Sequence, residues 1–249
     1  MEAITAAVNE FAPISLAEMD SVKLMNRIDT KYILSANRLA DILSEAKKNY
    51  RILEIDDQRE FLYRTTYFDT KDYKMYTAHQ NGKLNRYKIR TREYVVSKIH
   101  FLEVKFKNNK GRTLKERVKR SEGALSFKDA ETLFLNEAAP FSVDDLTPKL
   151  WNKFFRLTLV HKKAQERITI DYNLSFKNEK GKEKELPRLS IIEVKQDKYT
   201  ADSDFLQILK ENHIYENRIS KYCIGSALLN PELKYNRFKE KLIKIDKLN

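Results

Sequence analysis

Residues 86–94 read RYKIRTREY and carry a basic side chain at every second position, at Arg86, Lys88, Arg90 and Arg92. Alternate residues of a β-strand point to the same side of a sheet, so the stretch predicts a strand with four cations on one face. Cations two positions apart lie about 7 Å from each other, and each such pair repels by roughly 2 kcal/mol at an effective dielectric constant near 20. A strand of this kind needs negative charge close to its basic face.

The composition of the chain points to a folded protein with an anionic partner. The 249 residues are 41% hydrophobic and 34% charged, and include only 5 Gly and 5 Pro, which argues against disordered and fibrous classes. There are 48 Lys and Arg against 36 Asp and Glu, a formal net charge of +12. A surplus of this size favours nucleic acid, an acidic membrane surface or a phosphate-rich small molecule as partner.

Cysteine use and hydropathy predict a soluble protein of the cytoplasm. Cys223 is the single cysteine, so an intrachain disulfide is impossible and a reducing compartment fits. The N-terminal residues lack the basic and then apolar pattern of a signal peptide. No apolar run approaches the roughly 20 residues of a membrane helix, so no membrane segment is expected.

Periodicity along the chain predicts an α+β fold in which helices pack outside a large, mainly antiparallel sheet or barrel. Helical patterns cover residues 14–26, 35–49, 71–80, 125–138, 142–155, 203–212 and 220–230. Strand patterns cover residues 27–34, 50–57, 61–69, 84–96, 98–108, 111–120, 156–165, 167–176 and 188–196. The three successive strands between residues 84 and 120 predict an antiparallel meander. We expect one domain over residues 1–230 and a basic tail over 231–249, either a loosely docked helix or partly disordered.

The alternation of RYKIRTREY recurs in five other predicted strands, which carry same-face charged residues at Glu103, Lys105 and Lys107; at Lys115, Arg117 and Lys119; at Glu193 and Lys195; at Arg27, Asp29 and Lys31; and at Arg167 and Asp171. One interpretation is a sheet with one solvated face and weak cross-strand ion pairs. The excess of Arg and Lys over carboxylates favours another, a closed sheet whose charged lumen surrounds a polyanion, with a few carboxylates left to hold metal ions.

Nucleic acid is the competing polyanion. Proteins that bind single strands place aromatic platforms among their basic residues, on the same face. Tyr87 and Phe106 are instead predicted on the face opposite the cations, and no RNP, zinc-finger or helix-turn-helix motif is present. Nucleic acid is therefore not the expected partner.

Eight motifs in order resemble the VTC domain, the catalytic domain of the vacuolar transporter chaperone polyphosphate polymerases and their bacterial relatives. They are LMNRIDTKYIL, TTYFDT, RYKIRTREY, FLEVKFK, TLKERV, HKKAQERITID, LSIIEVKQ and RISKYCIGSAL, and they run from about Met19 to Leu229. The domain belongs to the triphosphate tunnel metalloenzyme, or CYTH-like, superfamily. The resemblance implies an antiparallel eight-stranded β-barrel tunnel with helices packed outside. It also implies a metal-dependent transferase that moves the γ-phosphate of ATP onto a growing inorganic polyphosphate chain.

Matching the motifs position by position gives the expected site. The resemblance implies that the phosphates are contacted by Lys31, Arg90, Arg92, Lys105, Lys115, Lys163 and Arg167. It implies that Glu193 binds Mn²⁺ or Mg²⁺, while Glu103 either lies near the metal or neutralises Lys105. Further substrate-binding candidates are Arg27, Arg86, Lys88, Arg117, His161, Lys195, Arg218, Ser220 and Lys221. Arg86 and Lys88 among these rest on alternation alone.

The segment RISKYCIGSAL predicts a helix that begins after Ser220 as N-cap. Lys221 then lies in the first turn, where the helix dipole disfavours a cation unless a phosphate is bound there. Arg218 could support such a phosphate site. The alternative is a solvated lysine at a frayed helix start.

Departures from the family pattern leave the reaction open. CYTH members begin with E-x-E-x-K, whereas the corresponding strand here contains Asp29 and Lys31 in RIDTK, which argues against thiamine-triphosphatase and cyclase activities. His161 and Lys163 stand where the fungal polymerase has Tyr and Arg. A triphosphatase or polyphosphatase, or a non-catalytic polyphosphate-binding module, would need the same cationic lumen. The expected ligands are ATP and inorganic polyphosphate or triphosphate; the oligomeric state is not predicted.

Overall fold

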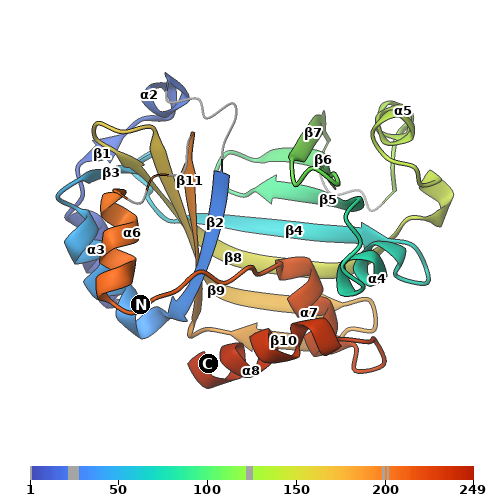
Figure 1. Cartoon of the computed structure of the whole chain (residues 1–249). Helices are drawn as coiled ribbons and strands as arrows, with labels where there is room; N and C mark the ends of the chain where they lie inside the picture. The colour runs from blue at the N-terminus through green and yellow to red at the C-terminus, as the bar shows by residue number, and fades with distance from the viewer. Residues whose placement is uncertain (1, 22–27, 122–125, 198–199, 201) are drawn as a thin grey trace.

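One mainly antiparallel sheet runs through the whole molecule (Figure 1). The computed structural model describes residues 2–21, 28–121, 126–197, 200 and 202–249. Its strands are β1 (Pro13–Ile14), β2 (Ile28–Ser35), β3 (Tyr50–Leu53), β4 (Phe61–Asp69), β5 (Arg86–Tyr94), β6 (Ile99–Lys107), β7 (Thr113–Arg120), β8 (Thr147–His161), β9 (Glu166–Asn178), β10 (Glu183–Leu186) and β11 (Leu189–Gln196). Its α-helices are α1 (Glu2–Asn9), α2 (Leu16–Ser21), α3 (Leu39–Ala46), α4 (Lys74–Gln80), α5 (Asp129–Ala138), α6 (Asp204–Glu211), α7 (Lys221–Leu229) and α8 (Lys239–Leu248). The 3₁₀-helices are η1 (Ala36–Arg38), η2 (Val143–Asp145) and η3 (Asn236–Phe238).

Eight of the strands form a continuous antiparallel path in the order β2-β11-β9-β8-β4-β5-β6-β7. Outside the path, β10 pairs with β9, β3 with β8, and β1 pairs with β3 in parallel. Figure 1 shows β2 and β11 crossing the direction of β4 and β8 steeply, as expected of a strongly twisted sheet. The predicted α+β fold with a large antiparallel sheet is confirmed. Among the described residues no ladder joins β2 to β7, so closure of the barrel stays a prediction.

The predicted meander is formed by β5, β6 and β7, which are neighbours in chain order. The turn between β6 and β7 is built by Asn108, whose Oδ1 accepts hydrogen bonds from the backbone N–H groups of Lys110 (3.0 Å) and Arg112 (2.9 Å). Gly111 in this turn has φ of 78°, a conformation that favours glycine. The turn fixes the register of two strands whose charged residues must face the same side.

The sheet has two faces of different character. We call inner the face that carries Lys31, Glu193 and Asp171, and outer the opposite face. On the outer face, α1, α3 and α6 cover one apolar cluster, while α5 covers a second on β5 and β6. Helix α3 shows why: Leu39, Ile42, Leu43 and Ala46 are all 0% exposed, at the spacing of a single helix face. Burial of each Leu or Ile side chain contributes roughly 1.5–3 kcal/mol.

Part of the inner face is also covered, by the C-terminal helices. Tyr222 and Cys223 of α7, Phe238 of η3 and Ile245 of α8 are buried in a third apolar cluster with strand residues such as Phe154. The basic tail therefore contributes to this apolar cluster through one side of α8. The rest of the inner face is charged.

The helix predicted over residues 142–155 is wrong, because strand β8 runs through most of it. Leu150, Asn152 and Phe154 point to the inner face and are buried, and the outer-face residue Trp151 is half-buried. The outer face alternates less clearly, because Trp151 and Phe155 are half-buried while Lys153 is exposed, and the i, i+4 spacing of Leu150 and Phe154 imitates a helix. The helix predicted over 14–26 is represented by α2, and its last residues lie outside the described part of the chain.

Within the described ranges, no helix combines the length and the apolar character that crossing a membrane requires.

Candidate functional site

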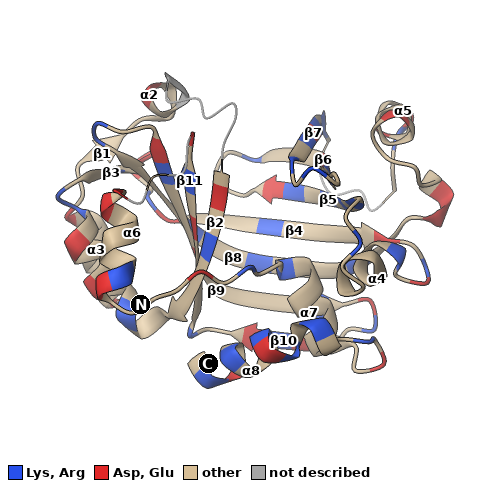
Figure 2. Ribbon diagram, in the orientation of Figure 1, with Lys and Arg blue, Asp and Glu red and all other residues tan. Residues whose placement is uncertain are grey.

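Strand register brings the charged residues of the inner face together. Lys31 lies opposite Glu193, and Glu193 opposite Thr169, across β2, β11 and β9. At the other end of the path, Arg90 lies opposite Glu103 across β5 and β6. Lys and Arg recur along the strands with fewer Asp and Glu between them (Figure 2). The predicted charged face is therefore present on both sides of the central strand β4, whose own inner residues, such as Tyr63 and Tyr67, are uncharged.

Glu193 is held between two lysines. Its Oε1 lies 2.6 Å from Lys31 Nζ and its Oε2 lies 2.8 Å from Lys195 Nζ. Lys195 also donates to Thr169 Oγ1 at 2.8 Å. Burial alone would raise the pKa of Glu193, but Lys195, Lys31 and Lys105 hold it well below its ordinary value. Glu193 is thus a fixed carboxylate whose side chain keeps 17% exposure.

Glu103, near the opposite end of the strand path, is likewise held between cations and is completely buried. Its Oε2 accepts from Arg90 at 2.6 Å, and its Oε1 is paired with Lys115. Burial would raise the pKa of Glu103, yet the charges of Arg90, Arg92 and Lys115 keep it far below the usual range. Both oxygens of Glu103 are occupied by Arg90 and Lys115, so Glu103 neutralises these two cations and not Lys105, the residue expected.

Three lysines stand directly opposite one another on β5, β6 and β7. We call Lys88, Lys105 and Lys115 the lysine row; Lys88 faces Lys105, and Lys105 faces Lys115. Lys88 Nζ donates to Ser220 Oγ at 3.0 Å, and Lys115 pairs with Glu103. Lys105 forms no hydrogen bond or ion pair within the described residues. Residues directly opposite have Cβ atoms about 5 Å apart, and like charges placed so are destabilising.

The pKa values of the lysine row are depressed, chiefly by burial. Burial lowers the pKa of Lys105 well below its ordinary value, and Arg90, Lys31 and Lys115 lower it further. Burial likewise lowers the pKa of Lys115 to about 8, against the opposing effect of Glu103. The row carries more positive charge than the neighbouring carboxylates offset.

A third group joins helix α7 to the sheet. We call Arg156, Asp171 and Lys221 the Asp171 group: Arg156 Nε and Nη2 donate to the two oxygens of Asp171 at 2.6 and 2.8 Å, and Lys221 Nζ pairs with Oδ2. The Arg156 guanidinium lies 4.9 Å from the ring centre of Tyr63, and Lys221 Nζ lies 4.5 Å from that of Phe154. Burial would raise the pKa of Asp171, but its two cations hold it well below the normal range.

Charges that are distant in the sheet act on one another. Glu193 on β11 counteracts the lowering of the Lys105 pKa, although four strands of the path separate β11 from β6. Burial lowers the pKa of Lys88 on β5, and Lys31 on β2 lowers it further. Contacts at the start of α7 agree with this: Ser220 accepts from Lys88 of β5 and Lys221 pairs with Asp171 of β9, so the sheet curls around its inner face.

Most of the predicted site residues belong to this space. Besides those already placed, Arg92 is buried, donates to Thr65 Oγ1 at 3.2 Å and lies 5.5 Å from the ring centre of Tyr63. Arg117 lies over the ring of Phe101 at 4.3 Å, opposite Glu103. Arg167 is opposite Lys195 on the inner side of β9. Arg86 shares the face of Lys88, and Arg218 is exposed beside Glu216.

The N-terminus of α7 is ordered rather than frayed. Ser220 is the N-cap, since its Oγ accepts from the Cys223 backbone N–H, as predicted. The Lys221 side chain is 13% exposed and bound to Asp171, which contradicts the alternative of a solvated lysine. Asp171 supplies the negative charge that the helix dipole favours near this end.

The structure does not bring His161 and Lys163 to the charged space. His161 shares the outer face with Leu157 and Leu159, its Nε2 lies 2.8 Å from Asp204 Oδ2, and its ring packs against Tyr50. Lys163 is exposed in the turn after β8. The placement of His161 as a substrate ligand is corrected on this ground, because strand parity directs it away from the lumen. Arg27 lies outside the described residues.

Metal binding depends on how many oxygens the chain can offer. No cluster of three or more Asp, Glu, His or Cys is suited to a metal ion in the described part of the chain. Mg²⁺ is commonly bound by one or two carboxylates together with substrate phosphates, so a single accessible carboxylate fits this mode. Glu193, which is partly exposed, meets that condition better than the buried Glu103.

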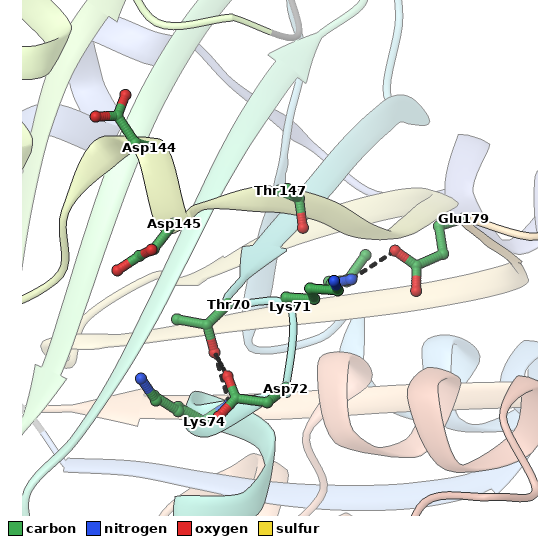
Figure 3. A pocket seen from close by; sticks show the side chains of 9 residues that line it. Thr70, Lys71, Asp72, Lys74, Asp144, Asp145, Thr147 and Glu179 are labelled. Atoms are coloured by element: carbon green, nitrogen blue, oxygen red, sulfur yellow. Dashed lines mark hydrogen bonds and ion pairs between the residues drawn. The ribbon is translucent and has the colours of Figure 1, made fainter.

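A cavity of about 390 Å³ is lined by residues outside the lysine row and the Asp171 group (Figure 3). Its lining mixes acidic and basic residues, and Lys149 Nζ lies 2.6 Å from Glu179 Oε2 at one side. Figure 3 shows Asp144 and Asp145 on the side opposite Glu179. None of the predicted site residues lines this cavity.

Two important residues, Arg156 and Asp171, were not among the predicted site residues. Asp171 was recognised on a charged strand face but matched no ligand position of the family. Arg156 was hidden at the boundary between a predicted helix and a predicted strand. The signal that could have found it is the alternation in RLTLV, which places Arg156 and Thr158 opposite Leu157 and Leu159.

The antiparallel sheet and its inner face rich in Lys and Arg are what the resemblance to triphosphate tunnel proteins implies. The family model described as "VTC domain" matches residues 26–230, so the chain belongs to the VTC domain family. None of the curated proteins compared with this chain matches it.

Solved structures support the class. An adenylate cyclase candidate from Bacillus halodurans has a TM-score of 0.51 and 16% identity, over 79% of this chain and 94% of that chain. HpAC1 from Hippeastrum, an adenylyl cyclase candidate whose structure was described as revealing a dominant triphosphatase activity, has a TM-score of 0.51 and 13% identity, over 84% of this chain and all of that chain. At these identities the likeness establishes the fold alone.

Proposed function

We propose that the chain is a metal-dependent polyphosphate polymerase that transfers the γ-phosphate of ATP to the end of a growing inorganic polyphosphate chain. The transfer takes place in a cationic tunnel, which the curled sheet closes around the phosphates. Family membership supports the class of substrate, and the inner face supports the assignment to this chain.

The observation that carries the proposal is the lysine row. Lys105 stands between Lys88 and Lys115 with a depressed pKa and without a bonded carboxylate in the described ranges. Such an arrangement destabilises the chain on its own and becomes favourable when an anion lies across it. A chain of phosphates, with a negative charge on every unit, matches a row of cations that crosses three strands.

Phosphoryl transfer needs positioning and charge neutralisation more than covalent help from the protein. Arg90 is fixed by Glu103, so its guanidinium is held in place before substrate binds. Arg92 is fixed by Thr65 and by aromatic rings, and an arginine remains charged throughout. We assign to Arg90, Arg92, Lys31 and Lys105 the orientation of the reacting phosphates, and to Lys115 and Lys195 the neutralisation of charge.

Triphosphate tunnel proteins generally use divalent metal ions, and Glu193 is the residue here that would hold Mn²⁺ or Mg²⁺ together with phosphate oxygens. The ion would supply neutralisation of charge on the phosphates. Lys31 and Lys195 orient Glu193 from both sides and keep it ionised, and an ionised carboxylate is what a hard cation requires.

Hydrolysis of triphosphate or polyphosphate is the second candidate. It is favoured by the description of HpAC1, a fold relative with a dominant triphosphatase activity. The same cations would serve, with water instead of a phosphate chain as the acceptor. A module that only binds polyphosphate is the remaining alternative.

The test is to incubate the purified full chain with ATP and Mn²⁺ or Mg²⁺, and to separate long phosphate chains from orthophosphate. Long chains are expected; orthophosphate alone would assign the hydrolase, and neither product would leave a binding module. Glu193→Gln and Arg90→Lys should each lower the rate about 10²–10³-fold. Glu183→Gln, which removes a carboxylate from the exposed Lys177–Glu183 pair, is the matched control and should leave the rate unchanged.

If Glu193→Gln were as active as the control variant, the assignment of the metal ligand would be wrong. Competition gives a second check on the substrate. Tripolyphosphate should displace bound polyphosphate far more effectively than an oligonucleotide of equal charge at the same salt concentration.

A further inference from the structure

A group of five cations lies where the lysine row ends. We call Arg86, Lys107, Arg218, Arg237 and Lys241 the basic cluster. Arg86 and Lys107 lie opposite each other on β5 and β6, one same-face position beyond Lys88 and Lys105. The cluster therefore continues the charged inner face towards the N-terminal end of β5 and the C-terminal end of β6.

The other members come from the C-terminal part of the chain. Arg218 precedes the N-cap Ser220, whose Oγ accepts from Lys88 at 3.0 Å. Lys241 of α8 donates to the Arg218 backbone oxygen at 2.5 Å. The Arg237 guanidinium packs so closely on Gly82 that a Cβ added there would lie 2.3 Å from it, which ties η3 to the turn before β5.

The members act on one another as like charges. Burial lowers the pKa of Lys107, and Arg86 and Arg218 lower it further. Burial also lowers the pKa of Lys241, and Arg237, Arg218 and Arg86 add to this effect. Within the part of the chain that is described, the carboxylate bonded to the cluster is Glu216, at 3.2 Å from Arg218.

We propose that the basic cluster is a second anion-binding subsite, which holds the part of a long phosphate chain that extends past Lys88. It rests on the proposed phosphate-chain substrate and adds to it a residue set, Arg237 and Lys241, that lies beyond the segment matched by the family model. The lysine row binds the nearer phosphates, and the basic cluster makes affinity depend on chain length.

A phosphate chain fits the cluster better than a nucleic acid does. The aromatic residues beside Arg86 and Lys107 are Tyr87 and Phe106, which lie on the outer face and stack on each other at 4.5 Å between ring centres. They are therefore not placed to stack on bases that follow the cations.

The experiment compares tripolyphosphate with a linear polyphosphate several times longer, by calorimetry on the full chain at fixed ionic strength. The Arg237→Gln/Lys241→Gln variant should bind the long chain about tenfold more weakly and tripolyphosphate within about twofold of the original. The matched control is Lys244→Gln/Lys247→Gln, which removes the same charge from exposed positions of α8 and should change both affinities less than twofold. Lys241→Gln alone should give a smaller loss in the same direction, which guards against misfolding of the double variant.

Five results would overturn the proposal. Equal losses in the double variant and the control would reduce the effect to net charge, and no loss in either would remove the subsite. A chain that binds tripolyphosphate but gains nothing from longer polyphosphate would defeat this inference alone, whereas failure to bind either would defeat the proposed function as well. Tighter binding of an oligonucleotide of equal charge would assign the cluster to nucleic acid.

Discussion

The Asp171 group and the lysine row occupy the same inner face and differ in how their charges are balanced. In the Asp171 group, Arg156 and Lys221 share one carboxylate at bonding distance and lie against aromatic rings. In the lysine row, Lys105 stands between two other lysines, and Glu103 reaches only Lys115. The first group is balanced mainly by its own contacts, whereas in the second no carboxylate of the described residues is bonded to Lys105.

This difference separates residues that hold the fold from residues that we propose to bind phosphate. The Asp171 group connects β8, β9 and α7, so its charges fix the helix on the sheet. In the lysine row, Lys115 is paired with Glu103, but the three lysines themselves stand opposite one another and repel. Substitutions in the two groups should therefore change stability in opposite directions.

The largest effect is expected from Asp171→Asn. It leaves two buried cations without their carboxylate, and breaking a buried ion pair costs roughly 3–5 kcal/mol. Urea denaturation should show that loss in the free energy of unfolding, while the exposed-pair control Glu183→Gln should change it by less than about 0.5 kcal/mol. Equal effects of the two variants would show that the Asp171 group does not hold α7 on the sheet.

A smaller effect of opposite sign is expected from Lys105→Met. The variant removes a half-buried cation with a depressed pKa, so the free energy of unfolding should rise by about 1 kcal/mol. The affinity for tripolyphosphate should fall about tenfold. Lys153→Met, at an exposed position on the outer side of β8, should change neither quantity appreciably. A Lys105→Met variant that lost stability would place Lys105 with the structural group.

The fold could be predicted where one face of an element is buried and the other is charged. The β5–β6–β7 meander and helix α3 have this property, so alternation and helical spacing both identified them. The first half of strand β8 escaped because the spacing of Leu150 and Phe154 imitates a helix, whereas its second half was predicted within the strand over 156–165. Helix α1 was not predicted, although Ile4, Ala7 and Val8 pack against α3, because a stripe of three residues in an eight-residue helix gives a weak signal.

The members of the site could be predicted better than their partners. Alternation identified Arg90, Lys105 and Glu193, but the pairing of Glu103 with Arg90 and Lys115 depends on the register of three strands. Pairing of Lys221 with Asp171 also requires that α7 lie across the inner face, which local sequence does not specify. For His161 the alternation in RLTLVH correctly indicates an outer-face position, but the match to a family position took precedence over it.

The smallest effect concerns Lys115, the member of the lysine row that has a carboxylate partner. Burial lowers its pKa to about 8, whereas an unfolded lysine titrates near 10.5. The folded chain thus binds fewer protons than the unfolded chain between these values, so this residue destabilises the fold below pH 8 and does so less as the pH rises from 8 towards 10.5.

A bound phosphate chain raises the pKa again, so binding at pH 8 should take up about half a proton at Lys115. Calorimetry in two buffers of different ionisation enthalpy measures this uptake. Lys115→Arg keeps the charge without titrating and should reduce the uptake by that amount, leaving the contributions of Lys195 and Lys221, whose pKa values burial also lowers to about 8. An unchanged proton uptake in Lys115→Arg would mean that Glu103 already balances the charge of Lys115. Lys115 would then be neutralised by its own contacts, as the Asp171 group is.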